Sequence, residues 1–128
     1  MEKPGKKVRD VRFFSAKNQA MMLVHSEEAR AYSKYLESRD EVEAYEVCKE
    51  MDEGRLKTVS RIDIRGEYFE QPWSTDFYIK YVDGTIAIRE VVRSSDLEKR
   101  AEVEKLELSR RYWSLLGIGD WKVVSFDR

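Results

Sequence analysis

The sequence is poor in the residues that build disulfides and zinc sites. It contains one cysteine, Cys48, and one histidine, His25, among 128 residues. A single cysteine forms no internal disulfide, a pattern typical of proteins in a reducing compartment. A zinc site built from several Cys and His ligands is therefore not predicted. We expect Cys48 to be a small core residue and the protein to be cytoplasmic.

Long apolar runs and a strong net charge are also missing. No segment approaches the ~20 apolar residues that a bilayer span needs, and no signal-peptide core follows the N-terminus, so no membrane partner is predicted. The net charge is −1, so no overall positive field indicates a nucleic-acid partner. With 41% hydrophobic and 38% charged residues, the chain is predicted to fold around a compact core beneath a charged surface.

Positive charge is nevertheless concentrated at the N-terminus. Six Lys or Arg residues stand among the first seventeen residues, against two acidic ones. We expect residues 1–20 to form a basic, partly ordered segment and residues 21–128 to form a single domain, because a chain of this length has no room for a second core. The basic segment is either a solvated tail or a contact for DNA phosphates, where Lys and Arg release counterions.

Local patterns predict a mixed α/β fold. Ser26 is typical of a helix N-cap, with Glu27 and Glu28 in the first turn of a helix that runs to about Ser38. Apolar periodicity predicts a second, long helix from about residue 96 to residue 116. Alternation predicts strands over residues 42–48, 59–64, 75–82, 85–92 and 121–126. The sequence therefore favours a mixed β-sheet covered by helices.

The turns in this pattern are marked by small and polar residues. Asp52-Glu53-Gly54 is interpreted as a turn. Asp83-Gly84 is the strongest hairpin signal in the chain, and it predicts that the strands on either side of it pair antiparallel. Gly117 and Gly119 end the long helix.

An acidic pair is carried by this predicted hairpin. With Asp83-Gly84 as the turn, Asp76 lies opposite Glu90 or Arg89, where facing Cβ atoms are ~5 Å apart. Two carboxylates at that distance repel unless a cation lies between them, and carboxylate oxygens on a rigid sheet suit Mg²⁺ or Mn²⁺. Such an ion polarises a phosphodiester and activates water. The alternative is structural: Asp76 caps a strand and Glu90 pairs with a surface Arg.

Short motifs in a fixed order resemble the TnsA-type transposase endonucleases. The N-terminal part contributes Phe14-Ser15-Ala16-Lys17-Asn18, Ser26-Glu27-Glu28, Leu36-Glu37 and Tyr45-Glu46. The middle contributes Gln71-Pro72, Asp76-Phe77, Asp83-Gly84 and Glu90-Val91-Val92. The segment from Glu104 to Val124 is the most similar part, and the resemblance extends over residues 12–126.

The resemblance implies a fold, an activity and partners. The fold is the restriction-endonuclease-like PD-(D/E)xK type, a mixed sheet with an antiparallel hairpin flanked by helices. The implied activity is Mg²⁺- or Mn²⁺-dependent cleavage of double-stranded DNA at transposon ends, beside a separate strand-transfer transposase subunit. Asp76 and Glu90 are the implied metal ligands and catalytic residues. The family's second, C-terminal domain is outside the resemblance.

Two positions depart from the family pattern. The helix position that normally bears a catalytic Glu is Ala29, which leaves the neighbouring Glu28 as the candidate helix carboxylate. The strand position that normally bears a Lys is Val92, which cannot offset charge developing on a phosphate. Arg93 is sent to the opposite face by alternation, and Lys80 shares a face with Asp76 but lies ~13 Å along the strand. Lys99 or Arg100 of the long helix are candidate replacements.

The remaining candidates concern DNA contact and the alternative functions. Lys17 and Asn18 are DNA-backbone contacts by resemblance, Arg12 belongs to the basic segment, and Trp73 stands beside Pro72 where its ring can stack on a base. Core packing is favoured for Trp113 and Trp121. The alternatives to a nuclease are a catalytically degenerate module that binds DNA or a transposase partner, and a phage-type nuclease for head completion or repair.

Overall fold

The computed structural model describes residues 10–127. In chain order its elements are β1 (Val11–Ser15), β2 (Ala20–Val24), α1 (Glu27–Ser38), β3 (Val42–Glu50), α2 (Glu53–Leu56), the 3-10 helix η2 (Gly66–Glu70), β4 (Ser74–Tyr81), β5 (Ile86–Arg93), the 3-10 helix η3 (Ser94–Glu98), α3 (Arg100–Leu115) and β6 (Trp121–Phe126). Over these residues, no helix has the length and apolar character needed to cross a bilayer.

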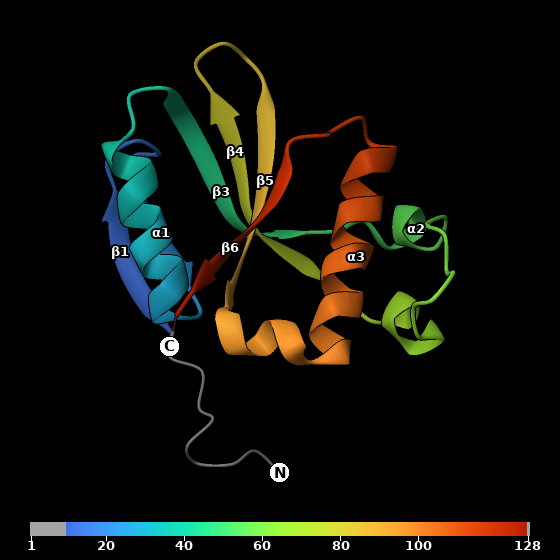
Figure 1. Ribbon diagram of the computed structural model, residues 1–128. Helices are drawn as coiled ribbons and strands as arrows, with labels where there is room; N and C mark the ends of the chain where they lie inside the picture. The colour runs from blue at the N-terminus through green and yellow to red at the C-terminus, as the bar shows by residue number, and fades with distance from the viewer. Residues whose placement is uncertain (1–9, 128) are drawn as a thin grey trace.

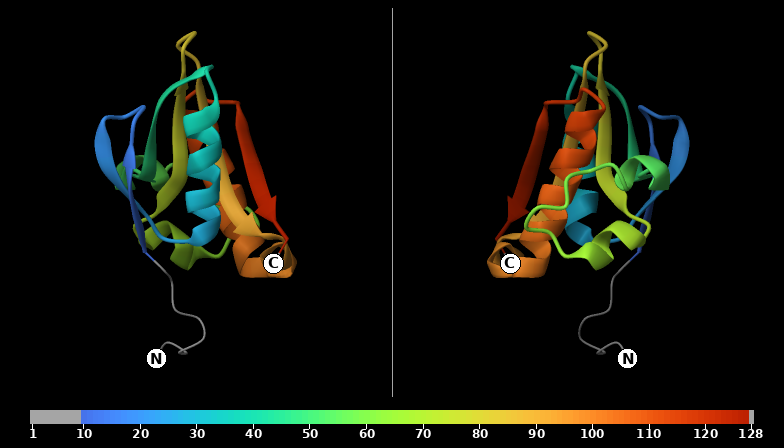
Figure 2. Two further views of the ribbon diagram at one scale, coloured as in Figure 1. Left: turned by 90° about the vertical axis from the view of Figure 1, so that its left-hand side faces the viewer. Right: turned by 90° about the vertical axis from the view of Figure 1, so that its right-hand side faces the viewer.

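A mixed four-stranded sheet with the order β3-β4-β5-β6 forms the centre of the molecule. β4 pairs antiparallel with both β3 and β5, whereas β6 pairs parallel with β5. Helices α1 and α3 lie on opposite sides of this sheet (Figure 1). The separate β1–β2 hairpin lies beside β3, at the edge away from β6 (Figure 2). This arrangement confirms the predicted restriction-endonuclease-like fold.

Helix α1 begins where the sequence predicts. The Ser26 hydroxyl accepts a hydrogen bond from the Ala29 amide at 3.0 Å, which satisfies one of the free donors of the first turn. The helix then buries Ala29 and Leu36 in a cluster with Phe77 and Ile79 of β4. The Ser26 cap and this apolar stripe together fix which face of α1 covers the sheet.

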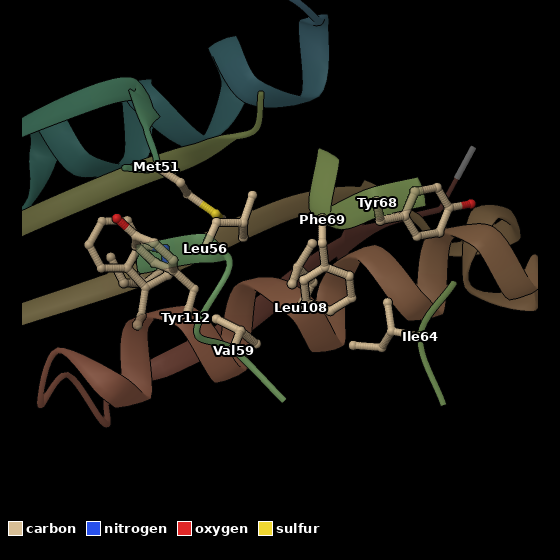
Figure 3. Packing of buried hydrophobic residues seen from close by; sticks show 10 residues of the cluster. Met51, Leu56, Val59, Ile64, Tyr68, Phe69, Leu108 and Tyr112 are labelled. Atoms are coloured by element: carbon tan, nitrogen blue, oxygen red, sulfur yellow. The ribbon is translucent and has the colours of Figure 1, made fainter. Parts of the chain in front are cut away.

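Helix α3 covers the other face of the sheet with a larger apolar cluster. Leu108 and Tyr112 of α3 pack with Met51, Leu56 and Phe69, which come from the segment between β3 and β4 (Figure 3). Trp113 is buried in the same cluster and Trp121 packs against it, as predicted. The segment between β3 and β4 therefore closes the core on the α3 side.

The β4–β5 hairpin turns at Asp83-Gly84, as predicted. Gly84 has a φ of 89°, a left-handed conformation that favours glycine. The Asp83 carboxylate accepts hydrogen bonds from the Thr85 amide at 2.9 Å and from the Thr85 hydroxyl at 2.7 Å. This turn sets the register in which Phe77 faces Arg89.

The prediction of a strand over residues 59–64 was wrong. Val59 and Ile64 are buried, but Ile62 is exposed and Asp63 has a φ of 64°, which an extended strand does not adopt. The carbonyl oxygens of Ser60 and Ile62 accept hydrogen bonds from Arg111 of α3, both at 2.9 Å, in place of a neighbouring strand.

Two other boundaries differ from the sequence-based prediction, and the N-terminal segment is described in part. The segment Asp52-Glu53-Gly54, interpreted as a turn, instead begins the short helix α2, because the Asp52 side chain accepts a hydrogen bond from the Arg55 amide as its N-cap. The long helix is divided at Lys99, which has extended backbone between η3 and α3. Of the basic segment expected over residues 1–20, residues 11–15 form strand β1, and residues 1–9 lie outside the described residues.

Candidate active site

The predicted acidic pair lies where the β4–β5 ladder ends. Residue pairing between the two strands runs from Lys80 and Ile86 to Phe77 and Arg89. At the next position Asp76 and Glu90 come together, and each carboxylate binds the backbone of the opposite strand. The Asp76 amide donates to Glu90 Oε1 at 3.0 Å, and the Val91 amide donates to Asp76 Oδ2 at 2.8 Å. Carboxylate oxygens thus replace the backbone acceptors at this point.

Glu90 is held from the α3 side by two hydroxyl groups. Thr75 Oγ1 donates to Glu90 Oε2 at 2.7 Å, and Ser109 Oγ of α3 donates to the same oxygen at 2.5 Å. The two hydroxyls are held in turn by indole groups, because Trp113 Nε1 donates to Thr75 Oγ1 at 2.7 Å and Trp121 Nε1 donates to Ser109 Oγ at 3.0 Å. This buried network fixes one orientation of the Glu90 carboxylate.

Burial and mutual repulsion disfavour two negative charges at this point. Burial, followed by the charge of Glu90, raises the pKa of Asp76 to about 8. Burial also raises the pKa of Glu90, although hydrogen bonds from Ser109, the Asp76 amide and Thr75 act in the opposite direction. A cation beside the pair would restore the charged form of both groups.

Asp76 and Glu90 line a cavity of about 140 Å³ beneath the edge of α3. Val92 is among the other residues that line it, as are three side chains that carry charge or an aromatic ring: Trp73, Glu102 and Lys105. Larger hollows of about 560 Å³ and 930 Å³ lie beside β3 and between β3 and α3, but neither is lined by Asp76 or Glu90. The small cavity is therefore the place where a ligand could meet both carboxylates.

The residues of this cavity fit a magnesium-type ion and do not form a cage of protein ligands. Among residues 10–127, no three His, Cys, Asp or Glu side chains are grouped so that they could hold a metal ion. Mg²⁺ differs from zinc in needing only one or two carboxylates, with water and substrate phosphates completing its octahedron. Asp76 and Glu90 supply those two carboxylates on rigid strands.

Glu28, the candidate helix carboxylate, is placed differently. Its side chain is buried in the first turn of α1, where its Oε2 lies 3.1 Å from Nε of Arg93 at the end of β5. Glu28 is not one of the residues that line the Asp76–Glu90 cavity. Arg93 thus lies on the α1 side of the sheet, as alternation predicts, and joins α1 to β5.

Lys17 and Asn18 connect the β1–β2 hairpin to its neighbours. Lys17 Nζ donates to the Val42 carbonyl at 2.8 Å, and the Lys17 amide donates to Glu37 Oε1 at 3.3 Å. Asn18 Oδ1 accepts from the Tyr45 amide of β3 at 2.9 Å. These bonds give the two residues of the Phe14–Asn18 motif a structural role in holding the hairpin against α1 and β3.

The other two DNA-contact candidates differ in their positions. Arg12 is exposed on β1. Trp73 is half-buried at the wall of the acidic cavity, with its indole Nε1 donating to the Tyr68 carbonyl and its ring 5.7 Å from the Tyr68 ring in an edge-to-face contact. Of the four DNA-contact candidates, Trp73 is the one that borders the acidic pair.

Several residues of the site were not identified from the sequence. Thr75 precedes Asp76 on β4 and reaches Glu90 from the neighbouring strand. Glu102, Lys105 and Ser109 come to Glu90 or its cavity through the packing of α3 on the sheet. The only sequence signal of these three residues is helical spacing, since they are separated by three and four residues. The two cations that were proposed instead pair elsewhere: Lys99 with Asp96 at 2.9 Å and Arg100 with Glu104 at 2.7 Å.

The mixed sheet and its hairpin carboxylates define a nuclease-type domain. The family model for the TnsA-like endonuclease N-terminal domain matches residues 39–125, which include β3 to β5, all of β6 but its last residue, and the whole acidic cavity. The chain therefore belongs to the TnsA-like endonuclease N-terminal family, a family of nuclease-like transposase modules. The hairpin β1–β2 and helix α1 precede the matched region. No curated protein gives a significant sequence match to the chain.

Proposed function

We propose that the protein is a metal-dependent endonuclease that cuts double-stranded DNA at transposon ends, beside a separate strand-transfer subunit. The observation that supports this function is the reciprocal pair of Asp76 and Glu90, each bound to the other's strand at 2.8–3.0 Å and both facing one cavity. Membership of the TnsA-like family supports the nuclease class and the transposition context.

The side chains of the cavity have distinct tasks in this function. Asp76 and Glu90 would hold Mg²⁺ or Mn²⁺. Such an ion would polarise the phosphodiester and lower the pKa of a water bound to it. Thr75 and Ser109 keep the Glu90 carboxylate in one orientation, so that the charge it presents does not move. Trp73 and Val92 give the cavity apolar wall and would limit the water around the pair.

Metal titration and DNA cleavage, measured on the same samples, test this proposal. Calorimetric titration with Mn²⁺ should show binding to the wild type and not to Asp76→Asn, in which the amide oxygen can still accept from the Val91 amide. Nicking of plasmid DNA should fall on the order of 100-fold in the variant, the size of effect seen when one electrostatic contributor to a transition state is removed. The exposed Asp40→Asn substitution is the matched control and should change neither result.

A binding module without cleavage is the second candidate function. It is favoured by Val92 in the position of the strand Lys and by Ala29 in the position of the helix Glu. This module would hold DNA or a transposase partner through the basic N-terminal residues and Trp73. Binding of duplex DNA with neither Mn²⁺ binding nor nicking in the wild type would replace the first proposal by this one.

A further inference from the structure

We propose that Lys105 of α3 supplies the positive charge of the active site by binding a non-bridging oxygen of the DNA phosphodiester. This inference rests on the proposed DNA-directed function. It assigns to Lys105 the positive charge that the strand lacks because Val92 occupies the position of the family's Lys. The step involves no covalent change at Lys105 and no proton transfer. The ammonium group binds the phosphate and offsets the charge that develops on it.

Lys105 lines the same cavity as Asp76 and Glu90. It approaches from α3, whereas the two carboxylates lie on β4 and β5, so a phosphate group can lie between the helix and the strands. Val92 lines the cavity on the sheet side and is apolar. A phosphate in this cavity would therefore meet the carboxylate-bound ion on one side and Lys105 on the other.

Aromatic side chains position the Lys105 ammonium group. Its Nζ lies 5.4 Å from the ring centroid of Trp73 and 5.9 Å from that of Tyr68, within the range of cation–π attraction. The Trp73 ring is itself anchored, because its Nε1 donates to the Tyr68 carbonyl. The two rings hold the positive charge near the cavity and leave its three donors available to a ligand.

Among the described residues, Lys105 differs from the other cations of α3 because its ammonium group has no carboxylate partner. Arg100 pairs with Glu104 at 2.7 Å, and Arg110 and Arg111 pair with Glu107 at 2.6 and 2.8 Å. No carboxylate of residues 10–127 lies within 4.0 Å of Lys105 Nζ; Glu102 lines the same cavity without reaching that distance. A phosphate oxygen would be the first full negative charge to pair with it.

Charge-removing and charge-keeping variants test the role of Lys105. Lys105→Met removes the charge but keeps an unbranched apolar side chain against Trp73, and Lys105→Arg keeps the charge. The exposed α1 residue Lys34 provides the matched control, Lys34→Met. Binding of a fluorescent DNA duplex is measured by anisotropy with Ca²⁺ at several salt concentrations, and nicking is measured in single turnovers with Mg²⁺.

Loss of one phosphate contact has a defined signature in these measurements. For Lys105→Met the slope of log K against log salt should become shallower by about 0.9, and nicking at saturating protein should fall on the order of 100-fold. Lys105→Arg should restore the slope, and Lys34→Met should match the wild type. Circular dichroism spectra that coincide for all variants would show that the fold is unchanged.

The outcomes separate this inference from the proposed cleavage. If the wild type nicks DNA, Asp76→Asn does not, and Lys105→Met keeps the wild-type slope and rate, the role of Lys105 is overturned and the nuclease stands. If the wild type does not nick but Lys105→Met still lowers the salt slope, Lys105 is a phosphate-binding residue of a binding module. An unchanged slope without any nicking would refute both.

Discussion

At the scale of single residues, Asp76 and Glu90 serve the sheet as well as the cavity. Each carboxylate accepts a backbone amide of the other strand, at the position where regular pairing between β4 and β5 ends. An apolar replacement would leave a buried amide without an acceptor, which costs about 1–3 kcal/mol. Isosteric amide variants are therefore the appropriate substitutions for testing activity, because they keep an acceptor oxygen in place.

The raised pKa of Asp76 predicts how the stability of the metal-free protein depends on pH. Its pKa is about 8 in the folded protein and about 3.9 in an unfolded chain, so the folded state binds the proton more tightly between these values. The free energy of unfolding should therefore fall as the pH rises from 5.5 to 8, by at most about 1.4 kcal/mol per pH unit for this proton.

Urea unfolding in the presence of a chelator measures this dependence. Asp76→Asn carries no titrating proton at this position, so its free energy of unfolding should fall less steeply than that of the wild type over the same pH range. A wild-type stability that stays level or rises from pH 6 to pH 8 would contradict the burial argument. Saturating Mn²⁺ should flatten the wild-type curve, because bound cation favours the charged pair.

The sequence identifies the acidic pair and misses the residues around it for a physical reason. Asp76 and Glu90 follow from counting outward from the Asp83-Gly84 turn, which is a local signal. Lys105, Ser109 and Glu102 depend on how α3 is rotated on the sheet, and side-chain packing sets that rotation. The bonds from Lys17 and Asn18 to Val42, Glu37 and Tyr45 likewise depend on tertiary packing, and the sequence did not indicate them.

At the scale of elements, helices and strands with strong local signals were predicted correctly, whereas tertiary contacts determined the conformation of the segments that were predicted wrongly. Helix α1, strands β3 to β6 and the β4–β5 turn agree with their caps, alternation and turn residues. Residues 59–64 alternate like a strand, yet Arg111 of α3 binds two of their carbonyl oxygens. Hydrogen bonds from a distant helix therefore took the place of a sheet ladder that no neighbouring strand could supply.

The β4–β5 turn carries a prediction that concerns backbone conformation alone. Gly84 has a φ of 89°, and a Cβ added there would meet no heavy atom within 4 Å. Gly84→Ala should therefore lower the free energy of unfolding by about 1 kcal/mol through its left-handed backbone.

Thermal and urea unfolding compared with a second glycine variant check the cause of this effect. Gly66 also has nothing within 4 Å of an added Cβ, and its φ is not in the left-handed range. Gly66→Ala should change the stability little or raise it slightly, since alanine restricts the unfolded chain. Equal losses in the two variants would show that the left-handed conformation of Gly84 is not the cause.

At the scale of the whole molecule, one sheet separates two apolar clusters. The α1 side contains Leu36, Phe77 and Ile79, and the α3 side contains Ile88 and Leu108. Both clusters are built on the same strands, β4 and β5, whose successive residues point to opposite faces. The two halves of the core should therefore unfold together.

A substitution on one face, observed from the other, tests this cooperativity. Leu36→Ala on the α1 side should lower the free energy of unfolding by about 2–5 kcal/mol. All three tryptophans pack on the α3 side, so their fluorescence reports the opposite face. The fluorescence and circular dichroism midpoints should shift together. A fluorescence midpoint that stays at its wild-type value would show that the two faces unfold separately.

Two indole groups are connected to Glu90 of the acidic pair through one hydroxyl oxygen each. Trp113 donates to the Thr75 hydroxyl, and Trp121 donates to the Ser109 hydroxyl. The hydroxyls donate to Glu90, so a change in the charge of that carboxylate alters the acceptor strength that each indole N–H meets. The indole resonances of a nuclear magnetic resonance spectrum lie apart from the crowded amide region. The indole N–H resonances of Trp113 and Trp121 should therefore shift when Glu90 is protonated or an ion binds there, so no added label is needed to follow either event.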